Sequence, residues 1–478
     1  MSTKDYKVTI GIECHVQLKT KTKLFSAINN DARKATPNTL ISHIDLGMPG
    51  ALPVLNEAAV ILATRAAFAL GTRPQKFSGF DRKHYFYPDL PMGYQITQFY
   101  DPIIKDGNVT IIVDGETKTV GIHEAHLEAD AGKSVHPPGK DYSLVDLNRA
   151  GTPLLEIVSN PDLHSPQEAR AYARELYLLM RYADVSDANL YYGNMRFDVN
   201  VSVSKTDELG TRTETKNLNS FRSVEKAAEY EIKRQIGLLE KGQKVIQETR
   251  GWDDANMHTT SQRSKEEAHD YRYMPDPDLP PVILDDKFIE KVKKNMPLLP
   301  DDLRTRLTQI GIEADSIETL VDEPVAGRFI VDVIQHGDKD SVQKIVNWLT
   351  VDVQASVNSG ERKWNELKLN HEQFLGLAYM VKKAEVSSSG AKVVLLNMIN
   401  TGDDPSEIAK NKNIIQVSDS DEIEKIVDMV IKANPKAAND VRNGETKVIG
   451  FMVGQVMKES KGKANPGLAK ELIQKKLS

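Results

Sequence analysis

Hydrophobic and polar residues alternate in short runs over the first ~290 residues of the chain. Residues 8–18 follow the two-residue period of a half-buried strand. By that period Glu13, His15 and Gln17 point to one face of the strand, away from the apolar residues between them. Residues 195–204 alternate in the same way. Residues 110–113 and 119–123 are typical of a hairpin, because Asp-Gly is a strong turn dipeptide between them.

Segments whose apolar residues follow helical spacing lie between these strands. Asn56 opens a helix over residues 57–70, which Gly71 ends. Ser165 and Glu168 form a capping box, with proline at the first helical position, for a helix that reaches about residue 182. A further helix is predicted over residues 220–241. The N-terminal part of the chain is therefore expected to be of the α/β (α+β) class.

Two proline-containing segments interrupt the pattern, at residues 296–300 and 401–405. Between and beyond them the apolar spacing is almost wholly helical. We therefore predict three domains: a large mixed domain over residues 1–295, an all-α domain over 296–403 and a small all-α tail over 404–478. A chain of 478 residues agrees with this count, since domains usually hold about 100–200 residues.

Composition narrows the functional class. No run approaches the ~20 apolar residues needed to cross a bilayer, so no membrane partner is expected, and residues 1–7 do not have the pattern of a signal or transit peptide. Cys14 is the only cysteine, which excludes an internal disulfide and a cysteine-based zinc cluster. A reducing cytoplasm fits this usage, and we expect a cytoplasmic protein.

Basic residues gather at the C-terminal end although the net charge is −6. In the last helix, Leu468, Leu472, Ile473 and Leu477 are expected to face inward and Lys470, Lys475 and Lys476 outward. Such a surface could contact nucleic-acid phosphates or could simply be a solvated helical face, and the sequence leaves both readings open. The basic residues are Arg442, Lys447, Lys458, Lys461, Lys463, Lys470, Lys475 and Lys476, against Glu445, Glu459 and Glu471.

Carboxylates and imidazoles recur on predicted strand faces. Besides Glu13 and His15, they include His126, Glu128 and Asp130, the pair Asp198 and Asn200, and Glu156 within the apolar residues 154–158. A buried carboxylate must be paired, protonated or bound to a cation. Carboxylates with imidazole and no thiolate suit Mg²⁺ or Mn²⁺. Each residue taken alone could equally be structural.

Two further motifs are incomplete. Residues 132–134 resemble the end of a P-loop, but Leu127 stands where the first glycine is required. The Ser-rich residues 387–389 lack the glycines of a nucleophile elbow. The chain therefore shows no recognisable nucleophile and no standard nucleotide-binding loop.

Longer strings of residues carry a resemblance. The strings are residues 11–16, 18–20, 23–25, 80–91, 93–96, 126–128, 130–133, 145–149, 151–154, 193–196, 198–200, 214–217, 271–273, 277–280 and 462–466. In the right order and over essentially the whole chain, they resemble the family of the B subunit of aspartyl/glutamyl-tRNA(Asn/Gln) amidotransferase.

The resemblance implies a cradle domain, a helical domain and a tRNA-contacting tail. It also implies a two-step ligase reaction. ATP phosphorylates the side-chain carboxyl of Glu on tRNA(Gln) or of Asp on tRNA(Asn), and ammonia then displaces the phosphate. The ammonia would come from glutamine hydrolysed by an amidase A subunit, with a small C subunit completing a heterotrimer. The sequence does not tell which of the two aminoacyl-tRNAs is the substrate.

Matched motif by motif, the family's metal-binding positions fall on Glu13, His15, Glu128, Glu156 and Asp198, with Glu13, His15 and Glu128 as the catalytic residues. The expected cofactors are ATP and Mg²⁺. Lys216, Arg149 and Arg196 are candidates for phosphate contacts, and equally for structural partners of nearby carboxylates.

The chain departs from the family's pattern at three places. Residues 26–45 lack the paired cysteines with which some members bind zinc, so no zinc is expected. Cys14 replaces a common aliphatic residue, and Ala129 replaces an acidic one. Two other functions stay open: a scaffold that only docks tRNA onto the amidase, and an unrelated metal-dependent hydrolase.

Overall fold

The computed structural model describes residues 5–264, 270–360, 362–415, 420–443, 445, 447–460 and 464–477. The chain divides into two compact units, Met1–Pro300 and Asp301–Ser478. The first unit combines a large sheet with helices, and the second is helical. The finer division into three domains stays a prediction.

A nine-stranded sheet forms the first unit, in the order β14-β13-β12-β11-β1-β10-β7-β5, with β6 also paired to β7. Strands β12 and β13 run parallel, and the other neighbours run antiparallel. The strands are β1 (Lys7–Gln17), β5 (Ile104–Lys105), β6 (Asn108–Val113), β7 (Glu116–Ala129), β10 (Pro153–Ser159), β11 (Met195–Ser204), β12 (Thr213–Leu218), β13 (Glu248–Asp253) and β14 (His258–Ser264).

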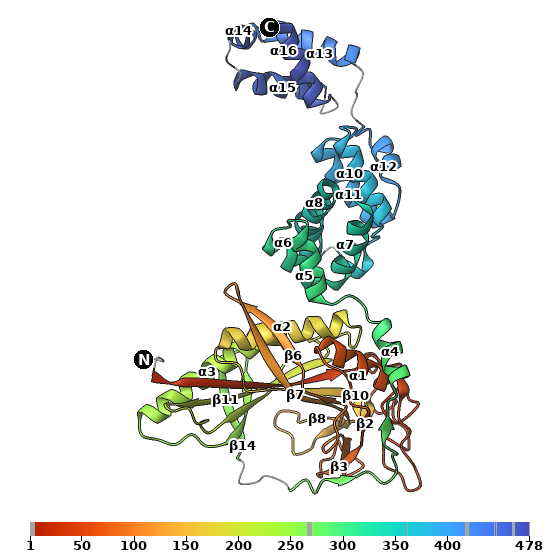
Figure 1. Ribbon diagram of the computed structural model, residues 1–478, viewed down its shortest axis with the longest axis vertical. Helices are drawn as coiled ribbons and strands as arrows, with labels where there is room; N and C mark the ends of the chain where they lie inside the picture. The colour runs from red at the N-terminus through yellow and green to blue at the C-terminus, as the bar shows by residue number, and fades with distance from the viewer. Residues whose placement is uncertain are drawn as a thin grey trace. The chain divides into compact units, whose positions relative to one another are not determined.

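Two helices, α2 (Pro166–Tyr182) and α3 (Phe221–Glu240), cover one face of this sheet, as Figure 1 shows. Strand β1 points Ile12 and Cys14 toward them, and both side chains are fully or almost fully buried in the core. Both helices begin where the sequence predicts, because the hydroxyls of Ser165 and Ser220 accept hydrogen bonds from backbone N–H groups of the first turn. The opposite face of β1 is left for Glu13 and His15.

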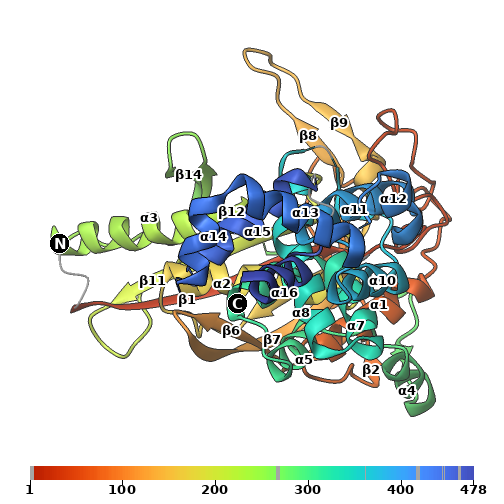
Figure 2. The same cartoon turned by 90° about the horizontal axis from the view of Figure 1, so that it is seen from above.

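Smaller elements border the sheet. Helix α1 (Glu57–Ala69) is capped by Asn56, as expected. The remaining strands pair in small sheets, and Figure 2 shows the β8–β9 hairpin extending beyond the large sheet. These elements are β2 (Phe77–Ser78), β3 (Asp81–His84), β4 (Tyr94–Thr97), β8 (Lys133–Val135), β9 (Leu144–Asp146), η2 (Leu147–Arg149), β15 (Met274–Pro275), β16 (Val282–Ile283) and α4 (Asp286–Lys294).

The predicted hairpin arm of residues 119–123 was too short. It belongs to β7, a strand of 14 residues that also carries His126 and Glu128. Asp130 lies just beyond the end of this strand. A single strand explains why the hairpin and the acidic motif follow each other without a turn residue.

The second unit is built from helices, and in the described residues of the whole chain no helix is both long and apolar enough to cross a membrane. Asp404 caps α12, because its side chain accepts hydrogen bonds from the backbone N–H groups of Ser406 and Glu407. The elements are α5 (Pro300–Gln309), α6 (Ala314–Asp322), α7 (Pro324–His336), α8 (Lys339–Asn347), the π-helical η4 (Trp348–Val353), α9 (Gln354–Asn358), η5 (Trp364–Glu366), α10 (His371–Lys382), α11 (Ser388–Thr401), α12 (Pro405–Asn411), α13 (Ser420–Ala433), α14 (Pro435–Arg442), α15 (Lys447–Glu459) and α16 (Pro466–Leu477).

The last helix has its own small core with α13 and α15, into which Leu472 and Ile473 are buried. Lys470 and Lys475 are exposed, as expected. Lys476 is partly exposed and forms a surface ion pair, because its Nζ lies 2.8 Å from a carboxylate oxygen of Glu424 and 2.7 Å from one of Asp428. Lys461 and Lys463 lie outside the described residues.

Candidate active site

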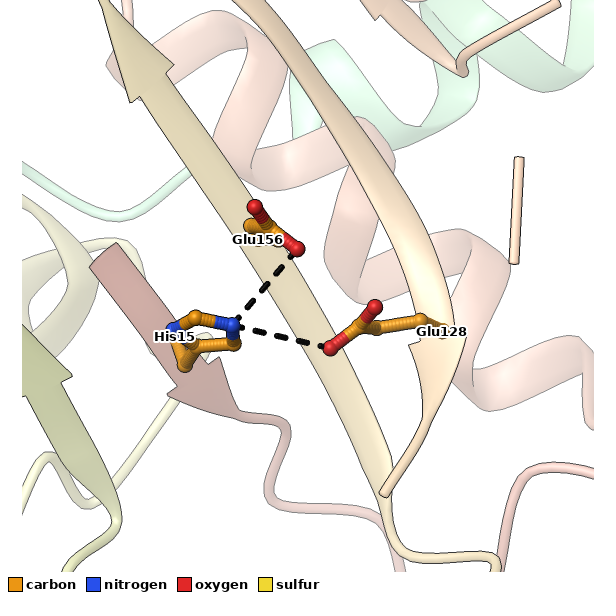
Figure 3. Close-up of side chains that lie close together, drawn as sticks. All are labelled: His15, Glu128 and Glu156. Atoms are coloured by element: carbon orange, nitrogen blue, oxygen red, sulfur yellow. Dashed lines mark ion pairs between the residues drawn. The ribbon is translucent and has the colours of Figure 1, made fainter. Parts of the chain in front are cut away.

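Three neighbouring strands bring His15, Glu128 and Glu156 together on the face of the sheet opposite α2 and α3. His15 on β1 is directly opposite Glu156 on β10, and Glu156 is directly opposite His126 on β7. Because opposed residues of antiparallel strands share a face, all of these side chains converge. His15 Nε2 lies 3.5 Å from Glu156 Oε2 and 3.8 Å from Glu128 Oε1, as drawn in Figure 3.

A second acidic group lies on the same face of the sheet, where β1 is followed by β11 and β12 instead of β10 and β7. Glu13 is directly opposite Asp198 on β11, and Glu214 follows on β12. One carboxylate oxygen from each of these three residues lies within 4.8 Å of the other two. The five residues predicted to bind metal therefore fall into two groups of ligands. Glu13 and Asp198 stand in one, and His15, Glu128 and Glu156 in the other.

The first group is strongly coupled through its charges. Burial opposes protonation of His15, but Glu156 and Glu128 outweigh it and raise the pKa of the imidazole to about 9. Burial and the charge of Glu156 raise the pKa of Glu128. Burial alone would raise the pKa of Glu156, but His126 and His15 hold the pKa of this carboxyl well below its ordinary value. The group thus combines a carboxyl whose pKa is lowered, a carboxyl whose pKa is raised and an imidazole whose pKa is raised to about 9.

Lys216 stands among the carboxylates of the second group. Its Nζ lies 3.0 Å from Asp198 Oδ2 and 2.9 Å from Glu214 Oε1, and Asn200 donates a hydrogen bond of 3.0 Å to Glu13. Burial disfavours the ammonium group, but Asp198 and Glu214 raise its pKa. Burial and the charges of Glu156 and Glu214 raise the pKa of Glu13. One lysine therefore neutralises only part of the negative charge of this group.

Both groups fit a hard divalent cation. The ligand atoms are carboxylate oxygens with one imidazole nitrogen, the donors that Mg²⁺ and Mn²⁺ accept. Among the described residues, Asn200 Oδ1 is a buried oxygen without a hydrogen-bond partner, and its amide group is bound to Glu13. A buried acceptor beside clustered carboxylates is what a bound cation or its water would satisfy.

The fold of the site is that of a known family. Residues 8–290 match the family model described as the GatB/GatE catalytic domain, and residues 328–477 match the GatB domain. This chain belongs to the GatB family. It is 45% identical to the B subunit of aspartyl/glutamyl-tRNA(Asn/Gln) amidotransferase from Thermodesulfovibrio yellowstonii, over 98% of both chains. It is 42% identical to that of Carboxydothermus hydrogenoformans over 99% of both, and 45% identical to that of Bdellovibrio bacteriovorus over the full length of both.

Within the GatB catalytic domain, the sequence reasoning placed His126 on an acidic strand face without assigning it to the site, and it did not propose Glu214 as a ligand. His126 Nε2 lies 3.2 Å from Glu156 Oε2, and Glu214 completes the second group of carboxylates. Both alternate with residues of the same strand, which was a usable signal: Glu214 shares a face with Lys216, and His126 with Glu128. A third residue, Lys83, had no such signal. Lys83 lies on β3, in a separate small sheet. Burial opposes the charge of this lysine, but the negative charge of Glu128 raises its pKa.

Arg149 and Arg196, predicted as phosphate contacts in this GatB chain, both face Asp130. The guanidinium Nε of Arg149 forms an ion pair with Asp130, and Arg196 Nη2 lies 3.6 Å from the same carboxylate. Arg149 also donates a hydrogen bond of 3.0 Å to the carbonyl oxygen of Gly193. Both arginines are therefore structural partners of a nearby carboxylate, which is the alternative that the sequence left open. Their contacts with phosphate stay a prediction.

Proposed function

We propose that this GatB-family chain activates the side-chain carboxyl of Glu-tRNA(Gln), Asp-tRNA(Asn) or both with ATP, and that ammonia then converts it to the amide. The observation that carries the proposal is the convergence of His15, Glu128 and Glu156 on the catalytic domain. The relatives that match over nearly the whole chain are named as the B subunit of such an amidotransferase.

The reaction needs two displacements because a carboxylate oxygen is a poor leaving group. A carboxylate oxygen of the substrate attacks the γ-phosphorus of ATP, the bond to the bridging oxygen breaks, and ADP leaves. The nitrogen of ammonia then attacks the acyl carbon, phosphate leaves with the bonding electrons, and the nitrogen loses a proton. The first step depends on positioning and on charge neutralisation.

We assign one Mg²⁺ to His15, Glu128 and Glu156 and a second to Glu13, Asp198 and Glu214. Bound there, Mg²⁺ would neutralise the phosphoryl oxygens. His15 also orients the substrate carboxyl, since its imidazole lies between two carboxylates on the open face of β1. The ammonium group of Lys216 supplies a fixed positive charge next to the second group.

Other chains would complete the activity. The relatives are named as a B subunit, which implies a complex of several chains. We propose an amidase A subunit that releases ammonia from glutamine and a small C subunit that holds the pair together. No nucleophile elbow occurs in this sequence, which is consistent with glutamine hydrolysis in another chain. A heterotrimer working in the cytoplasm stays our expectation.

The proposal is tested with Glu128→Gln in the assembled complex. ATP-dependent amide formation should fall by about a hundredfold or more, because a ligand of the catalytic cation is lost. Glutaminase activity and tRNA binding should be unchanged. The matched control is Glu116→Gln, an exposed glutamate at the start of the same strand. Unchanged amide formation in Glu128→Gln would show that the chain serves as a tRNA scaffold or that the site lies elsewhere.

A further inference from the structure

Strands β11 and β12 pair irregularly beside the second group of carboxylates. The register changes between Phe197 and Val199, so that Asp198 on β11 is opposed by two residues of β12, Lys216 and Asn217. Two residues against one make a β-bulge, and a bulge changes the direction in which the neighbouring side chains point. The irregularity of the sheet therefore lies at one of the ligands of the proposed cation.

The bulge allows β12 to serve both faces of the sheet. Glu214 and Lys216 point to the face of the site by the two-residue period, and in a regular strand Leu218 would follow them there. Instead Leu218 is opposite Phe197, and both side chains are buried in the core on the other face. One short strand thus supplies two charged side chains to the site and an apolar one to the core.

Asn217 holds the bulge in an uncommon backbone conformation. Its φ of 60° lies in the left-handed region, which asparagine tolerates better than most residues with a side chain. In this conformation its backbone N–H donates a hydrogen bond of 2.7 Å to Asp198 Oδ1, while Lys216 Nζ lies 3.0 Å from Oδ2. Asp198 is only 3% exposed, so its charge depends on such donors in place of water. The backbone of Asn217 therefore fixes the orientation of a buried ligand.

Glu214 is held in a similar way from the next strand. Strand β13 runs parallel to β12 and places Thr249 directly across from Glu214. The hydroxyl of Thr249 donates a hydrogen bond of 3.1 Å to Glu214 Oε2, and Lys216 Nζ lies 2.9 Å from Oε1. Each oxygen of this carboxylate thus meets a donor and keeps a further lone pair for an ion. Hydrogen bonds of this kind orient the carboxylates of metal sites.

We propose that Asn217 and Thr249 are positioning residues for the cation of the second group. Asn217 acts through its backbone N–H on Asp198, and Thr249 acts through its hydroxyl on Glu214. Together they turn the two carboxylates so that their oxygens converge with those of Glu13. A bulge that only shaped the strand would contribute to stability and not to ion affinity. The inference rests on the proposed function and deepens its assignment of the second cation.

The test is a titration of the assembled complex with Mn²⁺, followed by electron paramagnetic resonance. Thr249→Val removes the hydroxyl and keeps the shape of the side chain, and Asn217→Val disfavours the left-handed backbone. Each variant should bind one of the two ions about tenfold or more weakly, because the loss of a hydrogen bond to a metal ligand typically costs about 10- to 100-fold in affinity. The ion at His15, Glu128 and Glu156 should bind as in the original complex.

Rescue variants and a matched control separate positioning from backbone strain. Asn217→Gly accepts the left-handed backbone and Thr249→Ser keeps the hydroxyl, so both should bind Mn²⁺ as the original complex does. Asp114 is also exposed and left-handed, with a φ of 52°, in the turn between β6 and β7. Asp114→Val should therefore lower the melting temperature and leave both ions unchanged. In the Glu13→Gln background, Asn217→Val should not weaken the remaining ion.

Unchanged Mn²⁺ affinity in Thr249→Val and Asn217→Val would overturn the proposal. Equal weakening of both ions, or the same weakening in Asp114→Val, would overturn it as well, by showing a general loss of structure. The titration needs neither ATP nor tRNA. Unchanged amide formation in Glu128→Gln would therefore count against the proposed function without altering the result for Asn217 and Thr249, so the two proposals fail separately.

Discussion

His15 and Glu156 are directly opposite each other on β1 and β10, with 3.5 Å between Nε2 and Oε2. The contact joins a histidine near the N-terminus to a glutamate more than a hundred residues later. It makes the imidazole a cation in the protein without metal, because the pKa of His15 is raised to about 9. Without metal, the protonated imidazole of His15 therefore carries a positive charge at the position where we propose that a cation binds.

Glu156→Gln should lower the pKa of His15 from about 9 toward its ordinary value of 6.5, as measured by NMR titration of labelled histidine with metal removed. A raised pKa in the folded state stabilises the fold below pH 6.5, and this contribution disappears as the pH rises through 9. The original protein should therefore lose melting temperature over this interval in EDTA, and the variant should lose less. An unchanged His15 titration in the variant would contradict the pairing.

Glu128→Gln and Glu13→Gln should each remove a different divalent ion. The two glutamates belong to separate groups of ligands on either side of β1. Equilibrium binding of Mn²⁺, followed by electron paramagnetic resonance, should show one site fewer in each variant and two fewer in the double variant. If both single variants lost the same ion, the two groups of ligands would form one metal centre instead of two.

Glu231 should control the acid stability of the first unit. This fully buried carboxylate accepts a hydrogen bond of 2.8 Å from Arg234 and lies 3.0 Å from Arg250 Nε. Burial alone would raise its pKa, but the hydrogen bonds from Arg234 and Thr259 hold the pKa below 4.5. A depressed pKa stabilises the fold above pH 4.5, and this contribution is lost as the pH falls.

Glu231→Gln should accordingly reduce the melting temperature at pH 7, by an amount that shrinks as the pH drops below 4.5. Removing one partner of a buried ion pair costs about 3–5 kcal/mol, which sets the scale at neutral pH. Glu116→Gln is the control, since that glutamate is exposed. A difference that stays constant down to pH 3 would mean that Glu231 stabilises the fold through packing rather than through its charge.

The tail should separate into binding and structural lysines. Lys470→Ala with Lys475→Ala should weaken aminoacyl-tRNA affinity and flatten its dependence on salt, because both side chains are exposed. Lys476→Ala should affect tRNA affinity less and should instead loosen α16 from α13, since Lys476 pairs with Glu424 and Asp428. Hydrogen exchange of α16 measures the second effect. Equal losses of affinity from all three lysines would contradict the separation.

The sequence by itself determined the elements and their faces. The two-residue period assigned Glu13 and His15 to one face of β1, and capping residues assigned the starts of α2 and α3, because both signals act over a few neighbouring residues. Its motifs also identified the family, which the matches over residues 8–290 and 328–477 confirm. The ion pairs of Lys476 were not predicted, because its partners Glu424 and Asp428 lie on another helix.

Only the tertiary structure decided which of these faces meet. The register of β1 between β10 and β11 sets His15 against Glu156 and Glu13 against Asp198, and divides the ligands into two groups. Hydrogen bonds between strands far apart in the sequence fix that register, so no local pattern contains it. The same register places Gln17, two residues beyond His15, in the lining of a cavity of about 520 Å³. The spacing of residues along the chain predicted which side chains share a face of a strand. Strand pairing determined which of these side chains lie close enough to bind one ion.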